Sequence, residues 1–252
     1  MRFLGINLCE KVPDAKTIWK FKNDLAETET VDKLFCMFNE HLENKGLISH
    51  KGTIVDATFV DAPRQRNSRD ENKKIKNGVI PEEWEKPENK SKLAQKDIDA
   101  DWTKKNGERH FGYKDHVKCD ADSKLITNYS VTSASVHDSQ RCLVFIGQED
   151  EVLYADSAYS GKPIALALPE NCKNQICEKG YRNSPLTSEQ KMNNRRKSRI
   201  RCRIEHIFGF MTGAMHGITI RSIGITRAWM NIGITNLVYN FCRYSYLKRT
   251  SA

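Results

Sequence analysis

Two aspartates in the sequence each interrupt an apolar segment of β-type residues. Asp56 lies within Gly52 to Thr58, and Asp156 follows the run from Val152 to Ala155. A carboxylate that is buried without a partner in such a segment costs several kcal/mol. Each aspartate must therefore be hydrogen-bonded, neutralised or bound to a cation. Asp156 also stands where a strand is expected to end, which is where α/β sheets usually bind ligands.

A third carboxylate, Glu205, borders an apolar stripe with helical spacing. Such a stripe packs against the core, so Glu205 is expected to face the edge of the sheet and not open water. The stripe consists of Ile200, Ile204, Ile207, Phe208 and Met211.

Together these three acids predict a metal site for Mg²⁺ or Mn²⁺, because both ions prefer carboxylate and water ligands. Two such ions about 3.5–4 Å apart activate an attacking hydroxyl and stabilise the leaving oxygen of a phosphodiester. The alternative for each acid alone is a structural carboxylate, hydrogen-bonded in the core or capping a strand end. The order of strand, strand and helix favours catalysis by Asp56, Asp156 and Glu205.

A dense run of basic residues precedes Glu205 on the same predicted helix. The net charge of the chain is +9, which favours a polyanionic partner, either nucleic acid or an anionic membrane surface. Six bases without an intervening acid repel one another, so we expect them to contact DNA phosphates; the alternative is a solvated helix face. The run consists of Arg195, Arg196, Lys197, Arg199, Arg201 and Arg203.

Two further residues, His137 and Asp138, are auxiliary candidates at the site. They would tune or supplement the metal site. An equally weighted alternative is that Asp138 caps the N-terminus of the helix that follows.

The periodicity of the sequence predicts the elements that must position these residues. Two helices are expected over 14–48, a strand over 51–62, and a hairpin of strands over 110–119 and 125–131. The polar stretch 64–106 is expected to be a long insertion with one short helix near 92–99. Further helices are expected over 138–146, 161–168, 187–211 and 226–247, with strands over 152–155 and 175–177. This alternation predicts an α/β fold around a mixed sheet.

Several ordered blocks of the sequence resemble the DDE transposases of bacterial insertion sequences, in the branch of insertion-sequence family five. The resemblance covers nearly the whole chain. Arg201 matches an arginine of related transposases, whereas Ser198 and Thr212 stand where a tyrosine and a lysine often occur. The blocks are Gly52 to Thr58, Lys104 to Gly107, Phe111 to Lys114, Thr132 to Ser139, Ala155 to Tyr159, Glu178 to Arg182, and Arg201 to Gly209.

The resemblance implies a ribonuclease H-like core in which Asp56, Asp156 and Glu205 are the catalytic triad and hold magnesium. Water would free a 3′-OH at the element end, and that 3′-OH would attack target DNA. Double-stranded DNA is the implied partner, and two ends imply a homodimer. Two other hypotheses stay open: a nuclease that cuts without joining, and an inactive DNA-binding remnant.

The resemblance also implies a longer N-terminal helical region ahead of the segment that begins at Phe3. The chain is therefore expected to be N-terminally truncated, with 1–50 a remnant of that region and 51–252 the catalytic domain. No signal peptide or membrane-spanning stretch is evident in the sequence, and the eight cysteines are scattered without a C-x-x-C pair. A soluble bacterial protein of the cytoplasm, associated with the nucleoid, is expected.

Overall fold

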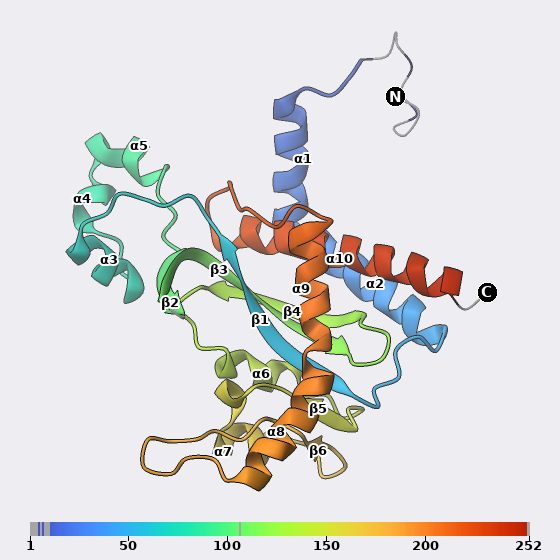
Figure 1. The fold of residues 1–252 in the computed structure, drawn as a ribbon. Coiled ribbons are helices and arrows are strands. Elements are labelled where there is room, and N and C mark those ends of the chain that lie inside the picture. The colour runs from blue at the N-terminus through green and yellow to red at the C-terminus, as the bar shows by residue number, and fades with distance from the viewer. Residues whose placement is uncertain (1–4, 6, 8–10, 106, 251–252) are drawn as a thin grey trace.

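A computed structural model describes residues 5, 7, 11–105 and 107–250 (Figure 1). The segment that begins at Phe3, on which the expected truncation rests, lies largely outside these described residues. The strands are β1 (Thr53–Asp61), β2 (Asp101–Lys105), β3 (Glu108–Asp120), β4 (Ile126–Ser133), β5 (Val152–Tyr154) and β6 (Lys173–Asn174).

The strands form one mixed sheet in the order β2-β3-β1-β5-β6, and β4 also pairs with β3. β1 is antiparallel to β3 and parallel to β5, and β5 is parallel to β6. An antiparallel hairpin is thus joined through β1 to two short parallel strands. The predicted mixed α/β sheet flanked by helices is confirmed, and its order is consistent with a ribonuclease H-like core.

Helices cover both faces of the sheet. On one face α9 (Arg203–Gly213) and α10 (Ile225–Thr250) pack in a core cluster that includes Ile54 and Val60 of β1. On the other face α6 (Ser139–Phe145) and α7 (Lys162–Ala167) pack against Val55 and Leu153. β1 is therefore buried on both faces, as its continuous apolar run predicts.

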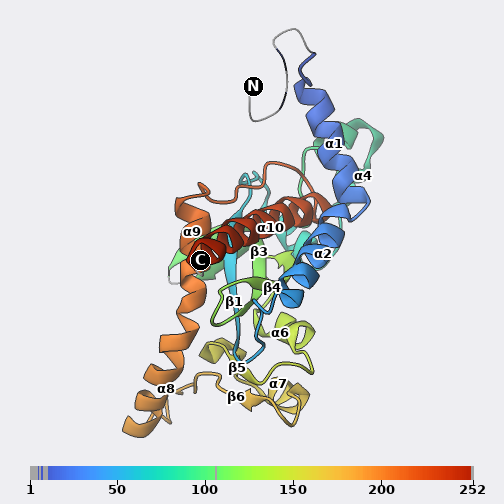
Figure 2. The same cartoon turned by 90° about the vertical axis from the view of Figure 1, so that its right-hand side faces the viewer.

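The two N-terminal helices, α1 (Ala15–Glu27) and α2 (Thr30–Asn44), confirm the pair expected over 14–48. Asp14 caps α1 by accepting a hydrogen bond from the backbone N–H of Thr17 at 2.7 Å. The Phe35 ring of α2 meets Tyr129 edge-on, with centroids 4.9 Å apart. α2 lies beside α10, while the first turns of α1 project away from the sheet (Figures 1 and 2).

The polar stretch after β1 is more ordered than the sequence predicts. It contains α3 (Arg69–Lys76), α4 (Glu82–Glu85), the 3₁₀ turn η2 (Pro87–Asn89) and α5 (Lys90–Leu93). The side chain of Trp84 is fully buried, and its Nε1 donates to Glu71 Oε1 at 2.8 Å. This indole supplies the small helical unit with a core of its own. The last residues of the stretch, 101–105, form the edge strand β2, which was not expected.

Two other predictions need correction. The long helix expected over 187–211 is divided at Cys202 into α8 (Ser188–Arg201) and α9, which continue in nearly the same direction (Figure 1). The strand expected over 175–177 lies slightly earlier, as β6. None of the helices within the described residues is both long and apolar enough to cross a membrane.

Candidate active site

The first two acids of the predicted triad lie side by side because of the register between β1 and β5. Ile54 pairs with Tyr154 in parallel alignment. Asp56 follows that pair by two residues within β1, and Asp156 follows it by two residues just beyond the end of β5, where the two carboxylates interact through their charges. The structure therefore brings both carboxylates to the same level at the end of β5.

Each of these aspartates uses one oxygen locally. Asp56 Oδ1 accepts from the backbone N–H of Ala57 at 2.9 Å. Asp156 Oδ1 accepts from the backbone N–H of Ala158 at 2.7 Å and caps the 3₁₀ turn η3 (Ser157–Tyr159). The second oxygen of Asp56, Oδ2, already contacts a cationic side chain, that of Arg201.

The third acid, Glu205, is joined to Asp56 by one arginine. Arg201 Nη1 donates to Asp56 Oδ2 at 2.8 Å, and its Nη2 donates to Glu205 Oε1 at 3.0 Å. The side chain of Asp56 is 15% exposed, whereas that of Glu205 is 59% exposed. Glu205 is thus more exposed to solvent than the sequence predicts. Ile204 and Ile207 of the apolar stripe pack against the sheet, whereas the side chain of Glu205 points away from it.

The charges of the trio act on one another. Burial raises the pKa of Asp56 above its usual range; the neighbouring Asp156 carboxylate adds to the rise, while Arg201 opposes it. Burial alone would lower the pKa of Arg201, but the field of Asp56, Glu205 and Asp156 outweighs it and raises that pKa. A cation is therefore favoured at this point of the molecule.

The residues present fit a divalent metal ion. Two of the three carboxylates bond to the guanidinium of Arg201, and the third, that of Asp156, acts on it through its charge, so this guanidinium stands in for a cation. Among the described residues, however, the three acids do not bring three ligand oxygens within 4.8 Å of one another. Binding of an ion by all three acids thus requires them to close around the space that the guanidinium now fills.

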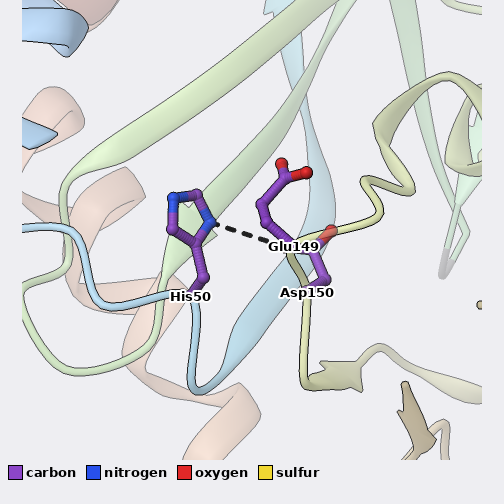
Figure 3. Close-up of side chains that lie close together, drawn as sticks. All are labelled: His50, Glu149 and Asp150. Carbon is purple, nitrogen blue, oxygen red and sulfur yellow. Dashed lines mark ion pairs between the residues drawn. The ribbon is translucent and has the colours of Figure 1, made fainter. Parts of the chain in front are cut away.

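Within the described part of the chain, another trio does meet that distance: His50, Glu149 and Asp150 (Figure 3). The two acids of this trio already have a positively charged partner, because Lys118 Nζ lies 2.8 Å from Asp150 Oδ2 and 3.7 Å from Glu149 Oε1. Asp150 also accepts from the Thr53 hydroxyl at 2.6 Å. This cluster is best explained as an ion-pair network that joins the start of β1 to the turn before β5.

The structure divides the predicted basic run into three groups. Lys197 donates to the Ile176 carbonyl at 2.9 Å, and Arg203 donates to the Ala121 carbonyl at 2.8 Å, so both are anchored to backbone. Arg201 belongs to the acidic trio. The side chains exposed on α8, without an ion pair among the described residues, are Arg195, Arg196 and Arg199.

The two auxiliary candidates differ in their contacts. His137 is exposed, and its Nδ1 lies 2.8 Å from the Ser139 hydroxyl. The Asp138 side chain makes no capping bond to α6. It accepts instead from Lys114 Nζ at 2.8 Å, an ion pair whose side chains are 8% and 16% exposed. The capping alternative for Asp138 is therefore wrong.

Sequence reasoning assigned no role to Tyr159, whose hydroxyl is buried near the acids. Burial raises the pKa of Tyr159 far above its usual range, and the charges of Asp56, Asp138 and Asp156 add to the rise. The hydroxyl has no hydrogen-bond partner in the structure. The sequence feature that could have pointed to Tyr159 is its place in the block Ala155 to Tyr159, which resembles the transposases.

This sheet has one aspartate on β1, one just after the end of β5 and a glutamate on the covering helix, and it is consistent with a ribonuclease H-like core. The chain matches the family model described as Transposase DDE domain over residues 48–241. It belongs to that family. The match includes all three acids and the bases of α8. No solved structure matches the chain.

Proposed function

We propose that the chain is the transposase of a bacterial insertion sequence, in the branch of family five, and that it cuts and joins DNA. The observation that carries this proposal is the meeting of Asp56 and Asp156 at one level of the sheet, with Glu205 tied to Asp56 through Arg201. The membership in the transposase family supports it.

In the proposed reaction, water attacks the phosphodiester at the element end, and the bond to the 3′ oxygen breaks to leave a 3′-OH. That 3′-OH then attacks a phosphodiester of the target and releases a second 3′-OH. Mg²⁺ or Mn²⁺ held by Asp56, Asp156 and Glu205, as two ions, would activate the attacking hydroxyl and stabilise the leaving oxygen.

The side chains of the protein orient the substrate. The exposed Arg195, Arg196 and Arg199 lie on α8, which leads directly to Arg201 and the acids. They would bind phosphates on the approach to the site, while Lys197 and Arg203 hold the helices in place through backbone contacts. His137 and Asp138 would support the site from its flank, Asp138 through Lys114.

Joining two element ends requires two active sites, so we propose a homodimer on double-stranded DNA in the bacterial nucleoid. In the same proposal 51–252 forms the catalytic domain and 1–50 an N-terminal helical region.

The test uses labelled DNA fragments taken from the regions that flank the gene of this protein, with Mg²⁺ or Mn²⁺. Cleaved ends and joined products together support a transposase. Cleavage without joining on a pre-cut end would instead indicate a nuclease. DNA binding with neither product would indicate an inactive remnant.

A further inference from the structure

The side chain of Arg201 differs from that of Arg203, the next base along the chain, in its hydrogen-bond partners. Its guanidinium hydrogen-bonds to Asp56 and to Glu205, and to no other group among the described residues. Arg203, by contrast, is bonded to the Ala121 carbonyl as well as to Asp122. Among the described residues, Arg201 thus has no backbone anchor, and only its two carboxylate contacts hold the guanidinium in place.

The guanidinium of Arg201 bonds to two of the three acids that are expected to hold the metal ion. It lies in the field of all three acids, which together raise its pKa. Its two hydrogen bonds use Asp56 Oδ2 and Glu205 Oε1, oxygens that a metal ion would need as ligands. A metal ion and this guanidinium therefore compete for the same acceptors.

The charges of the site explain why the contact forms. The carboxylates of Asp56 and Asp156 repel each other, and burial of Asp56 makes that repulsion costly. One guanidinium forks between two of the acids with charge-assisted hydrogen bonds, which are stronger than neutral ones. It carries a single charge, however, so a divalent cation compensates the three acids better.

We propose that Arg201 is an internal counter-ion of the acidic trio, which neutralises and separates the acids until a divalent cation displaces its guanidinium. The proposal rests on the proposed function of the site, since it takes Asp56, Asp156 and Glu205 as the metal ligands. The guanidinium can leave because Arg201 is the last residue of α8 and its side chain is 20% exposed.

Competition predicts that removal of Arg201 strengthens metal binding. A positioning role for Arg201, in which it holds the acids in place for the ion, predicts the reverse. The two roles can therefore be separated by an equilibrium measurement on the full chain without DNA.

The experiment measures Mn²⁺ affinity by the electron paramagnetic resonance of free Mn²⁺. Arg201→Gln is expected to bind Mn²⁺ about tenfold more tightly than the parent, because the competing charge-assisted bonds are gone. Arg203→Gln removes the same charge two residues away and controls for the general effect of charge; it is expected to change the affinity less than about twofold. Arg201→Lys, which cannot fork between two acids, should fall between them.

The counter-ion role would be overturned if Arg201→Gln bound Mn²⁺ no more tightly than Arg203→Gln. Asp56→Asn tests the site itself and should weaken Mn²⁺ binding. If Asp56→Asn leaves the affinity unchanged, or if the parent binds no Mn²⁺, the proposed metal site and its function fail together with the counter-ion.

A second measurement tests the proposal even if Arg201→Gln folds poorly in the absence of metal. The thermal midpoint of each protein is followed over a series of Mn²⁺ concentrations, since a ligand of the folded state raises it by mass action. The midpoint of Arg201→Gln should rise at lower Mn²⁺ concentrations than that of the parent. Equal dependence in both proteins would contradict the proposal.

Discussion

Asp56 and Asp156 stand at the same level because Ile54 and Tyr154, two residues before them, pair in parallel register. The sheet thus places Asp56 directly, and the turn η3 that follows β5 holds Asp156 beside it. A shift of register by one residue would turn one of them to the opposite face, since side chains alternate along a strand. The geometry of the site therefore depends on the packing of β1.

The contact between β1 and β3 gives a first prediction. Gly112 has φ +147°, and a Cβ there would lie 2.3 Å from the Val60 carbonyl oxygen. Gly112→Ala should therefore force the strands apart and lower the free energy of unfolding by about 3 kcal/mol or more. Gly209→Ala in α9, where an added Cβ meets nothing within 4 Å, is the control. Urea unfolding of both variants checks this; equal stability would contradict it.

Stability should also depend on Asp115, which is completely buried under α10. Burial raises the pKa of Asp115 to about 8. Between the unfolded value of about 4 and this folded value, the folded state holds a proton that the unfolded chain has lost. The free energy of unfolding should therefore fall as pH rises from about 4 to 8.

The variant Asp115→Asn removes this titration. It keeps an acceptor for Asn236, which donates to Asp115 Oδ1 at 3.2 Å. At pH 7.5 the variant should be more stable than the parent by several kcal/mol, and the difference should shrink by about 1.4 kcal/mol per pH unit toward pH 4. Chemical denaturation across that pH range is the measurement. If the difference in the free energy of unfolding grew toward acid pH, the predicted direction of the pH dependence would be wrong.

Much of this arrangement could be predicted from the sequence, because its signals are local. The β-type run around Asp56 and the turn residues after Asp156 predict strands and a strand end, and the structure has both. The edge strand β2 was missed because residues 101–105 are polar and lack alternation, so their pairing with β3 is a tertiary effect.

Contacts between distant residues could not be predicted. Arg201 was expected to bind phosphate, and nothing in the spacing indicates that it reaches Asp56 on another element. The cluster of His50, Glu149 and Asp150 depends likewise on Lys118, whose position follows only from the pairing of β3 with β1.

This cluster yields a third prediction. Lys118→Met should lower the free energy of unfolding by about 3 kcal/mol, because it leaves the buried Asp150 without its counter-charge. Mn²⁺ affinity of the folded chain should be unchanged in His50→Gln, since Lys118 and not a metal ion balances the cluster. Thermal unfolding and Mn²⁺ titration are the two measurements. Loss of Mn²⁺ binding in His50→Gln would move the metal site to this cluster.

The exposed bases of α8 give a fourth prediction. Replacement of Arg195, Arg196 and Arg199 by Gln should weaken DNA binding. It should also reduce the slope of log affinity against log salt by two to three, about 0.9 for each phosphate contact. Arg203→Gln is the control, since Arg203 already pairs with Asp122 at 2.8 Å and should change the slope little. Fluorescence anisotropy over a salt series provides the slopes, and an unchanged slope in the triple variant would exclude these bases from the DNA contact.

The central claim is that Asp56, Asp156 and Glu205 carry DNA joining. The most direct test is a strand-transfer assay with a pre-cut DNA end from the flank of the gene, target DNA and Mn²⁺, comparing the parent with Asp156→Asn. The asparagine keeps an oxygen that can cap η3, so the fold should be retained while the charge is lost. We predict joined product from the parent and at least about 10²-fold less from Asp156→Asn. Equal product from both proteins would contradict the assignment of the active site.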